Sequence, residues 1–182
     1  MRHIKIFKSI LLIISIFLIT SCSNKSAMKP EDFKNKEPKL IIEEYLTGNV
    51  KAWGILQNRS GKVTRQFSAD LNGSWDGKQL ILKEKFNWDD GEVQNREWTI
   101  NKIDENNYEG TAGDVVGKAI GYSYGPAFKF EYVLLVPVKG REMKITFDDW
   151  IFKQDDRVAI NRATMTKFGI KVAELTVVFV KD

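Results

Sequence analysis

The sequence predicts an all-β protein, an antiparallel up-and-down barrel of about 8–10 strands with a short N-terminal helix. From residue 50 onward, apolar and polar residues alternate with the period of two that is typical of strands with one buried face. Turn-forming residues separate these segments at short intervals, so consecutive strands are expected to pair as antiparallel neighbours. Because about ten strands follow one another without a long crossover, closure into a barrel would remove the exposed strand edges.

The chain begins with features of a secretion signal. Residues 1–8 are basic, and residues 10–19 form an apolar run that only Ser15 interrupts. A membrane-spanning helix needs about 20 apolar residues, so this run is too short to serve as one. Residues 1–21 are therefore predicted to be a signal peptide.

Residues 19–22 read Ile-Thr-Ser-Cys, which resembles the lipobox of bacterial lipoproteins. In that motif the cysteine is diacylated and becomes the new N-terminus, so we expect Cys22 to anchor the protein as a diacylglyceryl cysteine. Two acyl chains are enough for stable anchoring to a membrane. Ser23, in place of an Asp, favours the outer membrane facing the periplasm over the inner membrane of the cell envelope. The alternative is an ordinary signal peptide followed by a free thiol.

Processing at Cys22 would limit the chemistry of the mature chain. The only histidine, His3, would be removed, and the only cysteine would be acylated. These losses exclude Ser-His-Asp and Cys-His nucleophilic catalysis and the usual zinc sites. No cofactor is predicted, and no metal either, because the acidic doublets lack the spacing of a calcium loop.

The charge of the mature chain is nearly balanced, with 25 of the 28 Lys and Arg remaining against 24 Asp and Glu. The basic character of the full chain therefore belongs largely to the signal, and no nucleic acid partner is expected.

The remaining chain divides into a tether and one domain. Residues 22–37 are polar and lack an apolar period, so they are predicted to be the acylated cysteine and a flexible tether. Residues 38–182 are predicted to form a single barrel domain. The first ten, 38–47, suit a short helix because Pro38 lies near its start and Gly48 suits its C-terminal cap. That helix either closes one end of the barrel or covers apolar surface elsewhere.

The predicted strands follow from the alternation and from the turn residues between segments. Their approximate bounds are 50–57, 63–75, 79–88, 93–103, 108–115, 117–124, 127–138, 142–153, 158–165 and 170–180.

The hairpin over residues 79–100 places a charged pair on an apolar face. A three-residue loop needs a left-handed residue at its last position, which Gly91 supplies without a Cβ penalty. This loop sets Glu84 opposite Arg96, in line with two apolar pairs, Leu82 with Trp98 and Leu80 with Ile100.

The same reasoning predicts a second acid–arginine pair near the end of the chain. A two-residue turn after residue 138 places Phe130 opposite Asp149, on a face shared with Ile145, Phe147 and Ile151. A four-residue loop over 154–157 then sets Asp149 opposite Arg162.

Two acid–arginine pairs in an apolar barrel suggest a ligand site, because small-molecule sites are mostly apolar with a few convergent polar groups. The two arginine side chains could hold a carboxylate or phosphate head group. The predicted ligand-binding residues are Glu84, Arg96, Trp98, Asp149 and Arg162. The alternatives are that the pairs only fix strand register, or that these side chains point outward. Glu84 and Asp149 could also support glycoside hydrolysis, but an opposing arginine should lower each pKa, so no catalytic residue is assigned.

Glycines recur at positions 110, 113, 117, 121 and 125. Glycines in strands usually mark bulges, barrel corners or close backbone approach, and we favour that interpretation. The alternative is a flexible portal for a ligand, with Asp114 and Gly117 at its centre.

Several stretches resemble an uncharacterised bacterial lipoprotein family, domain of unknown function 3833. They include Gly48-x-x-x-Ala52-Trp53-Gly54, Trp75-Asp76-Gly77, Arg96-x-Trp98, Gly110-Thr111-Ala112-x-Asp114-Val115-Val116-Gly117, Phe147-Asp148-Asp149-Trp150 and Asn161-Arg162. The resemblance implies a secreted, lipid-anchored protein and favours a lipid ligand over a sugar. The expected fold is also similar to that of the calycins, the lipocalin and fatty-acid-binding group.

Three functions are compatible with these observations. The leading hypothesis is a membrane-anchored barrel that binds a lipid, fatty acid or similar amphiphile. The first alternative is a non-catalytic structural or interaction partner within an envelope protein complex. The third is a carboxylate-dependent hydrolase or isomerase.

Overall fold

The structure is a computed structural model that describes residues 27–138 and 140–182. The predicted signal peptide, 1–21, and the predicted acylation site, Cys22, lie outside the described residues. Within those that are described, no helix combines the length and apolarity needed to cross a membrane.

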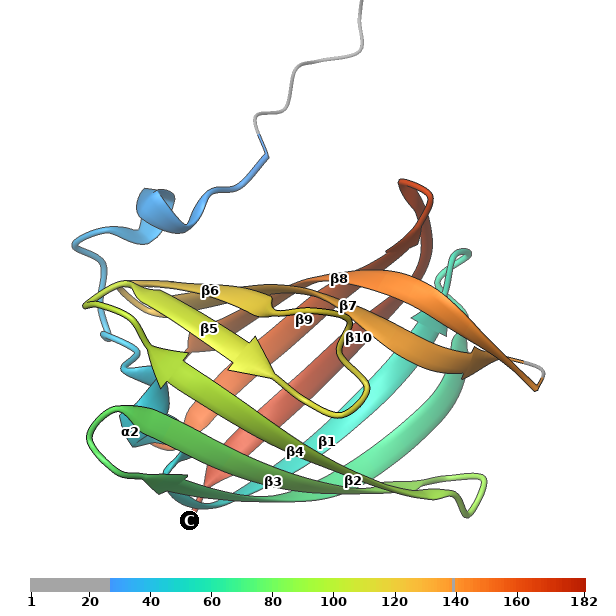
Figure 1. Cartoon of the computed structure of the whole chain (residues 1–182), viewed down its shortest axis with the longest axis horizontal. Helices are drawn as coiled ribbons and strands as arrows, with labels where there is room; N and C mark the ends of the chain where they lie inside the picture. The colour runs from blue at the N-terminus through green and yellow to red at the C-terminus, as the bar shows by residue number, and fades with distance from the viewer. Residues whose placement is uncertain (1–26, 139) are drawn as a thin grey trace, which may run out of the picture.

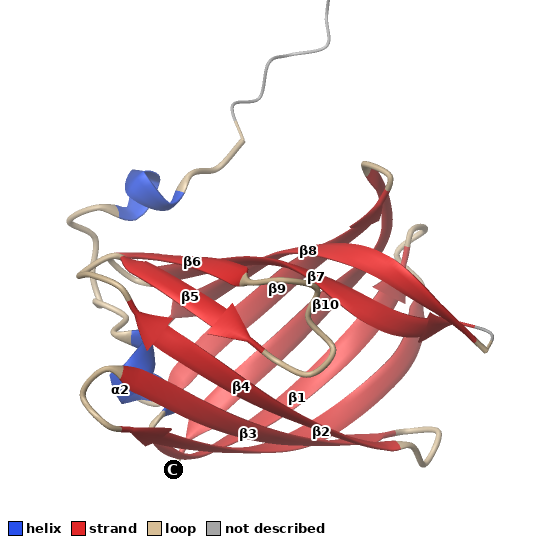
Figure 2. Ribbon diagram, in the orientation of Figure 1, coloured by secondary structure: helices blue, strands red, loops and turns tan. Residues whose placement is uncertain are grey.

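Ten antiparallel strands form a closed barrel (Figures 1 and 2). The strands are β1 (Gly48–Asn58), β2 (Val63–Trp75), β3 (Gln79–Trp88), β4 (Val93–Lys102), β5 (Asn107–Thr111), β6 (Ala119–Tyr124), β7 (Ala127–Val138), β8 (Arg141–Lys153), β9 (Val158–Lys167) and β10 (Ile170–Lys181). Each strand pairs with its neighbours in the sequence, and β1 also pairs with β10. The predicted fold class, an up-and-down barrel, is therefore confirmed.

The predicted strand bounds agree with the structure to within two residues, except at one place. The predicted strand 108–115 ends early, because β5 stops at Thr111. Residues 112–118 instead form a loop that bonds to β7: the Val116 N–H donates to the Val133 carbonyl, and the Leu135 N–H donates to the Asp114 carbonyl. The loop thereby continues the barrel wall beyond the short strands β5 and β6.

One end of the barrel is closed by α2 (Ile42–Leu46), which is shorter than the predicted helix over 38–47. Figure 1 shows α2 at the end where β1 begins and β10 finishes. Leu40, Ile42 and Leu46 are buried in the core there. The helix is fixed through Glu43, which pairs with Lys102 and accepts a hydrogen bond of 2.9 Å from the Tyr108 hydroxyl. The barrel-closing alternative for this helix is the one that the structure supports.

Part of the predicted tether is ordered against the barrel. The 3₁₀ helix η1 (Pro30–Phe33) places the Phe33 ring against Trp150 and Phe152 on the outer face of β8. Trp150 is 6% exposed even though its side chain points away from the barrel interior. The strands, α2 and the core all lie within residues 40–181, so a chain that starts at residue 23 contains the complete fold.

The register of the first predicted hairpin is confirmed. Glu84 pairs with Arg96, and the pairs Leu82–Trp98 and Leu80–Ile100 follow in line. Gly91 has the expected positive φ, +86°. In the β7–β8 hairpin, Phe130 pairs with Asp149 as predicted.

The predicted register between β8 and β9 is wrong by one residue. Asp149 lies opposite Ala163, and Arg162 lies opposite Trp150 on the outer face. The connection closes one residue earlier than the expected loop over 154–157, because the Gln154 N–H donates to the Val158 carbonyl at 2.8 Å and leaves a three-residue loop. The Asp155 carboxylate holds this loop by accepting hydrogen bonds from the N–H groups of Arg157 and Val158. A one-residue shift moves every side chain of a strand to the other face.

Candidate functional site in the barrel interior

Two adjoining chambers occupy the barrel interior. The inner chamber, next to α2, has a volume of about 100 Å³. The outer chamber lies towards the opposite end of the barrel, between the β1–β2, β3–β4, β7–β8 and β9–β10 hairpins, and has a volume of about 200 Å³. Five residues line both chambers: Phe67, Phe86, Arg96, Tyr132 and Leu175.

Apolar side chains make up most of the inner chamber wall. They come from α2 and from seven strands, and include Ile42, Leu46, Leu71, Leu82, Ile100, Phe128, Phe130, Ile151 and Phe179. Trp98 completes this wall, with its ring centroid 5.2 Å from that of Phe130 and 5.3 Å from that of Tyr132. The polar groups of the chamber therefore face a largely apolar and aromatic surrounding.

Arg96 lies where the two chambers meet, and its guanidinium is already paired. Its Nε and Nη2 donate to the Asp114 carboxylate at 3.0 and 2.8 Å. On the other side, Nη1 is 3.8 Å from Glu84 Oε2. The side chain is only 15% exposed. Bidentate pairs of this kind are among the strongest charge-assisted interactions in proteins.

Glu84 is the least satisfied polar group in the inner chamber. Its Oε2 atom is buried and has no hydrogen-bond partner among the described residues. Burial raises the pKa of this carboxyl to about 7, against the opposing effects of Arg96 and of a hydrogen bond from Trp98. The opposing arginine does act to lower this pKa, as expected, but the pKa is raised overall because loss of hydration outweighs the attraction at 3.8 Å.

Asp149 also lies in the inner chamber, but its partners are neutral. The Tyr132 hydroxyl donates to its Oδ2 at 2.9 Å, and the Asn161 side-chain amide donates to its Oδ1. Burial raises the pKa of the Asp149 carboxyl despite these two hydrogen bonds. Asn161, which is 3% exposed, takes the inward place that the sequence suggested for an arginine.

Arg162 is not part of this site. Its side chain is 61% exposed and forms an ion pair with Glu174 on the neighbouring strand β10. The predicted pair between Asp149 and Arg162 is therefore wrong, as a consequence of the register shift between β8 and β9. Of the five predicted ligand-binding residues, the structure brings together Glu84, Arg96, Trp98 and Asp149.

A second arginine, Arg65, lines the outer chamber, and the sequence analysis missed it. Its guanidinium bridges Asp90 at 2.8 Å and Glu92 at 2.9 Å and stacks over the Trp88 ring at 4.0 Å. The strand periodicity could have revealed this residue, because position 65 shares a face with Phe67 and two further buried residues, Ala69 and Leu71.

The glycine series serves close packing at three of its positions. A Cβ on Gly125 would lie 2.1 Å from the Phe33 backbone carbonyl oxygen. A Cβ on Gly110 would lie 2.4 Å from the Phe130 ring, and one on Gly121 would lie 2.9 Å from the Phe128 ring. This agrees with the favoured interpretation of these glycines. Of the two portal candidates, Asp114 is held by Arg96, and Gly117 has a positive φ of +76° in the loop bonded to β7.

In the residues that the structure describes, no group of three or more His, Cys, Asp or Glu side chains is arranged to hold a metal ion. The chemical capacity of the interior therefore rests on carboxyl groups, two guanidinium groups and one tyrosine hydroxyl, set in apolar walls.

Residues 16–181 match the family described as protein of unknown function (DUF3833). The chain belongs to this family. A search of curated proteins returned no match to the sequence.

Solved structures show related barrels at low sequence identity. The S-type phycobiliprotein lyase CPES from Guillardia theta aligns with a TM-score of 0.57 and 11% identity, over 77% of this chain and 90% of the lyase. A protein of unknown function of the DUF3598 family from Nostoc punctiforme aligns with a TM-score of 0.60 and 14% identity, over 81% of this chain. The present chain spans about half of that protein, 51%. These similarities show that the DUF3833 chain shares its barrel fold with both proteins.

Proposed function

We propose that this DUF3833 protein is a lipid-anchored protein of the cell envelope whose barrel binds a lipid, fatty acid or similar amphiphile. The observation that carries the proposal is the barrel interior, where apolar walls surround a small set of buried polar groups around Arg96. This combination is typical of small-molecule sites. The fold is compatible with such a role, and the specific support comes from the residues of this interior.

The size of the chambers restricts the ligand. The inner chamber has about 100 Å³ and the outer one about 200 Å³, so together they reach only the lower end of the range of about 300–1,000 Å³ that is typical of ligand pockets. We therefore propose a short-chain amphiphile, or the end of a longer one, as the occupant.

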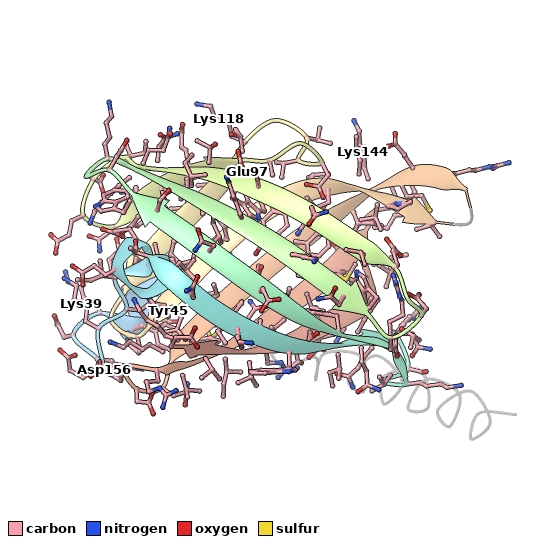
Figure 3. All side chains as sticks on the ribbon, turned by 90° about the horizontal axis from the view of Figure 1, so that it is seen from below. Lys39, Tyr45, Glu97, Lys118, Lys144 and Asp156 are labelled. Atoms are coloured by element: carbon pink, nitrogen blue, oxygen red, sulfur yellow. The ribbon has the colours of Figure 1, made fainter. Side chains whose placement is uncertain are left out.

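The location rests on the N-terminal sequence. An acylated Cys22 would hold the protein at a membrane, and Ser23 favours the outer membrane facing the periplasm. The polar outer surface of the barrel is consistent with an aqueous compartment: Figure 3 shows Glu97, Lys118 and Lys144 projecting from the ribbon, and Glu97 pairs with Lys83 at 3.9 Å on exposed sheet surface.

Native mass spectrometry on residues 23–182, mixed with a bacterial lipid extract, tests the binding proposal. We expect one stoichiometric adduct, whose mass identifies the ligand. Ala52→Leu, which fills space in the inner chamber, should weaken the adduct, whereas Arg162→Ala on the outer face should leave it unchanged. An apo mass across all lipid classes would contradict the proposal and favour a role as a protein partner in an envelope complex.

One observation also favours a carboxylate-dependent hydrolase or isomerase as a second candidate. Burial raises the pKa of Glu84 to about 7, a value suited to a general acid at neutral pH, and Asp149 lines the same chamber. Screening of chromogenic glycosides and esters between pH 4 and 9 tests this candidate. The activity should disappear in both Glu84→Gln and Asp149→Asn while the variants stay folded.

A further inference from the structure

Carboxyl groups outnumber basic groups in the barrel interior. The two chambers are lined by two arginine side chains and by four carboxyl groups, Glu84, Glu92, Asp114 and Asp149. Asp90 adds a fifth carboxyl group through its contact with Arg65. The interior therefore presents more carboxyl groups than guanidinium groups to anything that enters it.

Both guanidinium groups already have two carboxylate neighbours. Arg96 contacts Asp114 at 2.8 Å and Glu84 at 3.8 Å. Arg65 contacts Asp90 and Glu92 at 2.8 and 2.9 Å. In the inner chamber, which Arg96 lines and Arg65 does not, a carboxylate ligand would have to displace one of the two Arg96 partners and leave it without compensation in a buried site, which is costly. The outer chamber differs, because the Arg65 Nε atom is buried there without a hydrogen-bond partner among the described residues.

Hydrogen-bond acceptors, in contrast, are available in the inner chamber. Glu84 Oε2 is buried without a hydrogen-bond partner among the described residues, and it lies at the wall of the chamber. An unpaired buried acceptor is unfavourable and is relieved by a donor. An ammonium group supplies three donors and no acceptor, so its hydrogen-bonding capacity is complementary to this wall.

We infer that the inner chamber selects an amphiphile whose head group donates hydrogen bonds and carries positive charge, an alkylamine type, over one with a carboxylate. This inference rests on the proposed binding function and refines it. It reverses the sequence-based expectation that Arg96 receives an anionic head group, because Asp114 already takes that role.

The groups around Glu84 determine how binding should depend on pH. Glu84 is faced by Arg96 from β4, Asp114 from the β5–β6 loop, Tyr132 from β7 and Asp149 from β8. Burial raises the pKa of Glu84 to about 7. The carboxylate form therefore gains population as the pH rises from 6 to 8, and alkylamine affinity should increase over that interval.

Three ligands of equal chain length test the inference: octylamine, octanol and octanoate, measured by isothermal titration calorimetry on residues 23–182 at pH 7.5. We expect octylamine to bind at least tenfold more tightly than octanoate, with octanol between them. Ethylamine, which has the charge without the chain, serves as the control for binding to surface carboxylates and should not bind measurably.

Two variants connect the preference to the chamber. Glu84→Gln should reduce the octylamine preference to within about threefold, and Arg162→Ala should leave it unchanged. If Glu84→Gln does not fold, as judged by circular dichroism, Asp149→Asn is the variant that should reduce the preference.

The outcomes separate the inference from the proposed function. Tighter binding of octanoate would overturn the head-group inference while the barrel remains an amphiphile carrier. If a folded Glu84→Gln or Asp149→Asn variant keeps the preference for octylamine, the assignment to this chamber is wrong. Equal binding of all ligands would overturn it as well. Absence of binding by all three eight-carbon ligands at millimolar concentration would overturn the inference together with the proposed short-chain function.

Discussion

Arg96 and Asp114 form a bidentate ion pair between β4 and the loop over residues 112–118. Arg96 Nε and Nη2 donate to Asp114 at 3.0 and 2.8 Å, and the two residues are 18 positions apart. Arg96 belongs to β4, whereas Asp114 belongs to the loop that bonds to β7. The pair therefore links β4 to the loop that is bonded to β7. The two strands between them in the barrel, β5 and β6, are too short to make this connection themselves.

Loss of this pair should destabilise the protein. Asp114→Asn leaves the Arg96 guanidinium, which is only 15% exposed, without its closest carboxylate. We expect a decrease of about 1–3 kcal/mol in the free energy of unfolding, below the usual range for fully buried pairs because Asp114 is 29% exposed. Urea denaturation measures the change. Asp70→Asn, which breaks an exposed pair with Lys51, is the matched control and should cost less than about 1 kcal/mol.

The raised pKa of Glu84 should make stability decrease with rising pH. The folded protein holds a proton on this carboxyl up to about pH 7, whereas the unfolded chain releases it near its ordinary value of 4.5. Between these two values the folded state binds more protons, so the free energy of unfolding falls as the pH rises. We expect a decrease of roughly 1–3 kcal/mol between pH 4.5 and 7.5. Denaturation curves should show this slope in the wild type and a smaller slope in Glu84→Gln; equal slopes would contradict the assignment.

Glu43 should stabilise the closed end of the barrel with the opposite dependence on pH. Burial alone would raise its pKa, but hydrogen bonds from Lys102 and Tyr108 lower it overall. This contribution is therefore present above the unfolded value of 4.5 and is lost as the pH falls through the lower folded value. Glu43→Gln should cost about 2 kcal/mol at pH 7 and less at pH 3. Glu44→Gln, one position further along α2 and exposed, should have little effect in the same thermal denaturation series.

Two glycines of the series should respond differently to the same substitution. In Gly110→Ala the added methyl group would lie 2.4 Å from the Phe130 ring, so the ring must move within a packed interior. Overpacking of this kind typically costs about 1–3 kcal/mol. A Cβ on Gly113 has nothing within 4 Å, so Gly113→Ala should be nearly neutral. If both variants have the same unfolding midpoint, the explanation from close packing is wrong.

The proposed anchor can be tested on the full chain. Wild-type protein should incorporate radiolabelled palmitate and appear in the membrane fraction of the cell. Cys22→Ala should lose the label and remain unprocessed, whereas Ser21→Ala, which keeps a small residue before the cysteine, should retain both properties. Labelling of the Cys22→Ala variant would show that the lipid is attached at another residue.

The alternation of apolar and polar residues along the chain predicted most of the fold. Nine of the ten strands agree with the structure to within two residues, because a half-buried strand imposes a period of two that the sequence must display. The turn chemistry also fixed two registers, since Gly91 at +86° allows a three-residue loop that places Glu84 opposite Arg96.

The register beyond β8 depended on the tertiary structure. The sequence allows a four-residue loop after Lys153, but Gln154 pairs with Val158 and leaves a three-residue loop, in which the Asp155 carboxylate accepts two backbone hydrogen bonds. Because of that shift, Asn161 faces the interior and Arg162 faces outward. The site therefore lacks the second positive charge that the sequence predicted. The consequence is large because the period of a strand is two, so one residue reverses the face.

The sequence by itself predicted an antiparallel barrel of about 8–10 strands and the pairing of Glu84 with Arg96, both of which the structure confirms. Only the tertiary structure decided which groups surround and pair with these two side chains. The Asp114 loop takes the Arg96 guanidinium, and burial holds the Glu84 pKa near 7. Strand periodicity is local and is visible in the chain, whereas the pairing and hydration of a buried charge depend on residues that only the closed barrel brings together.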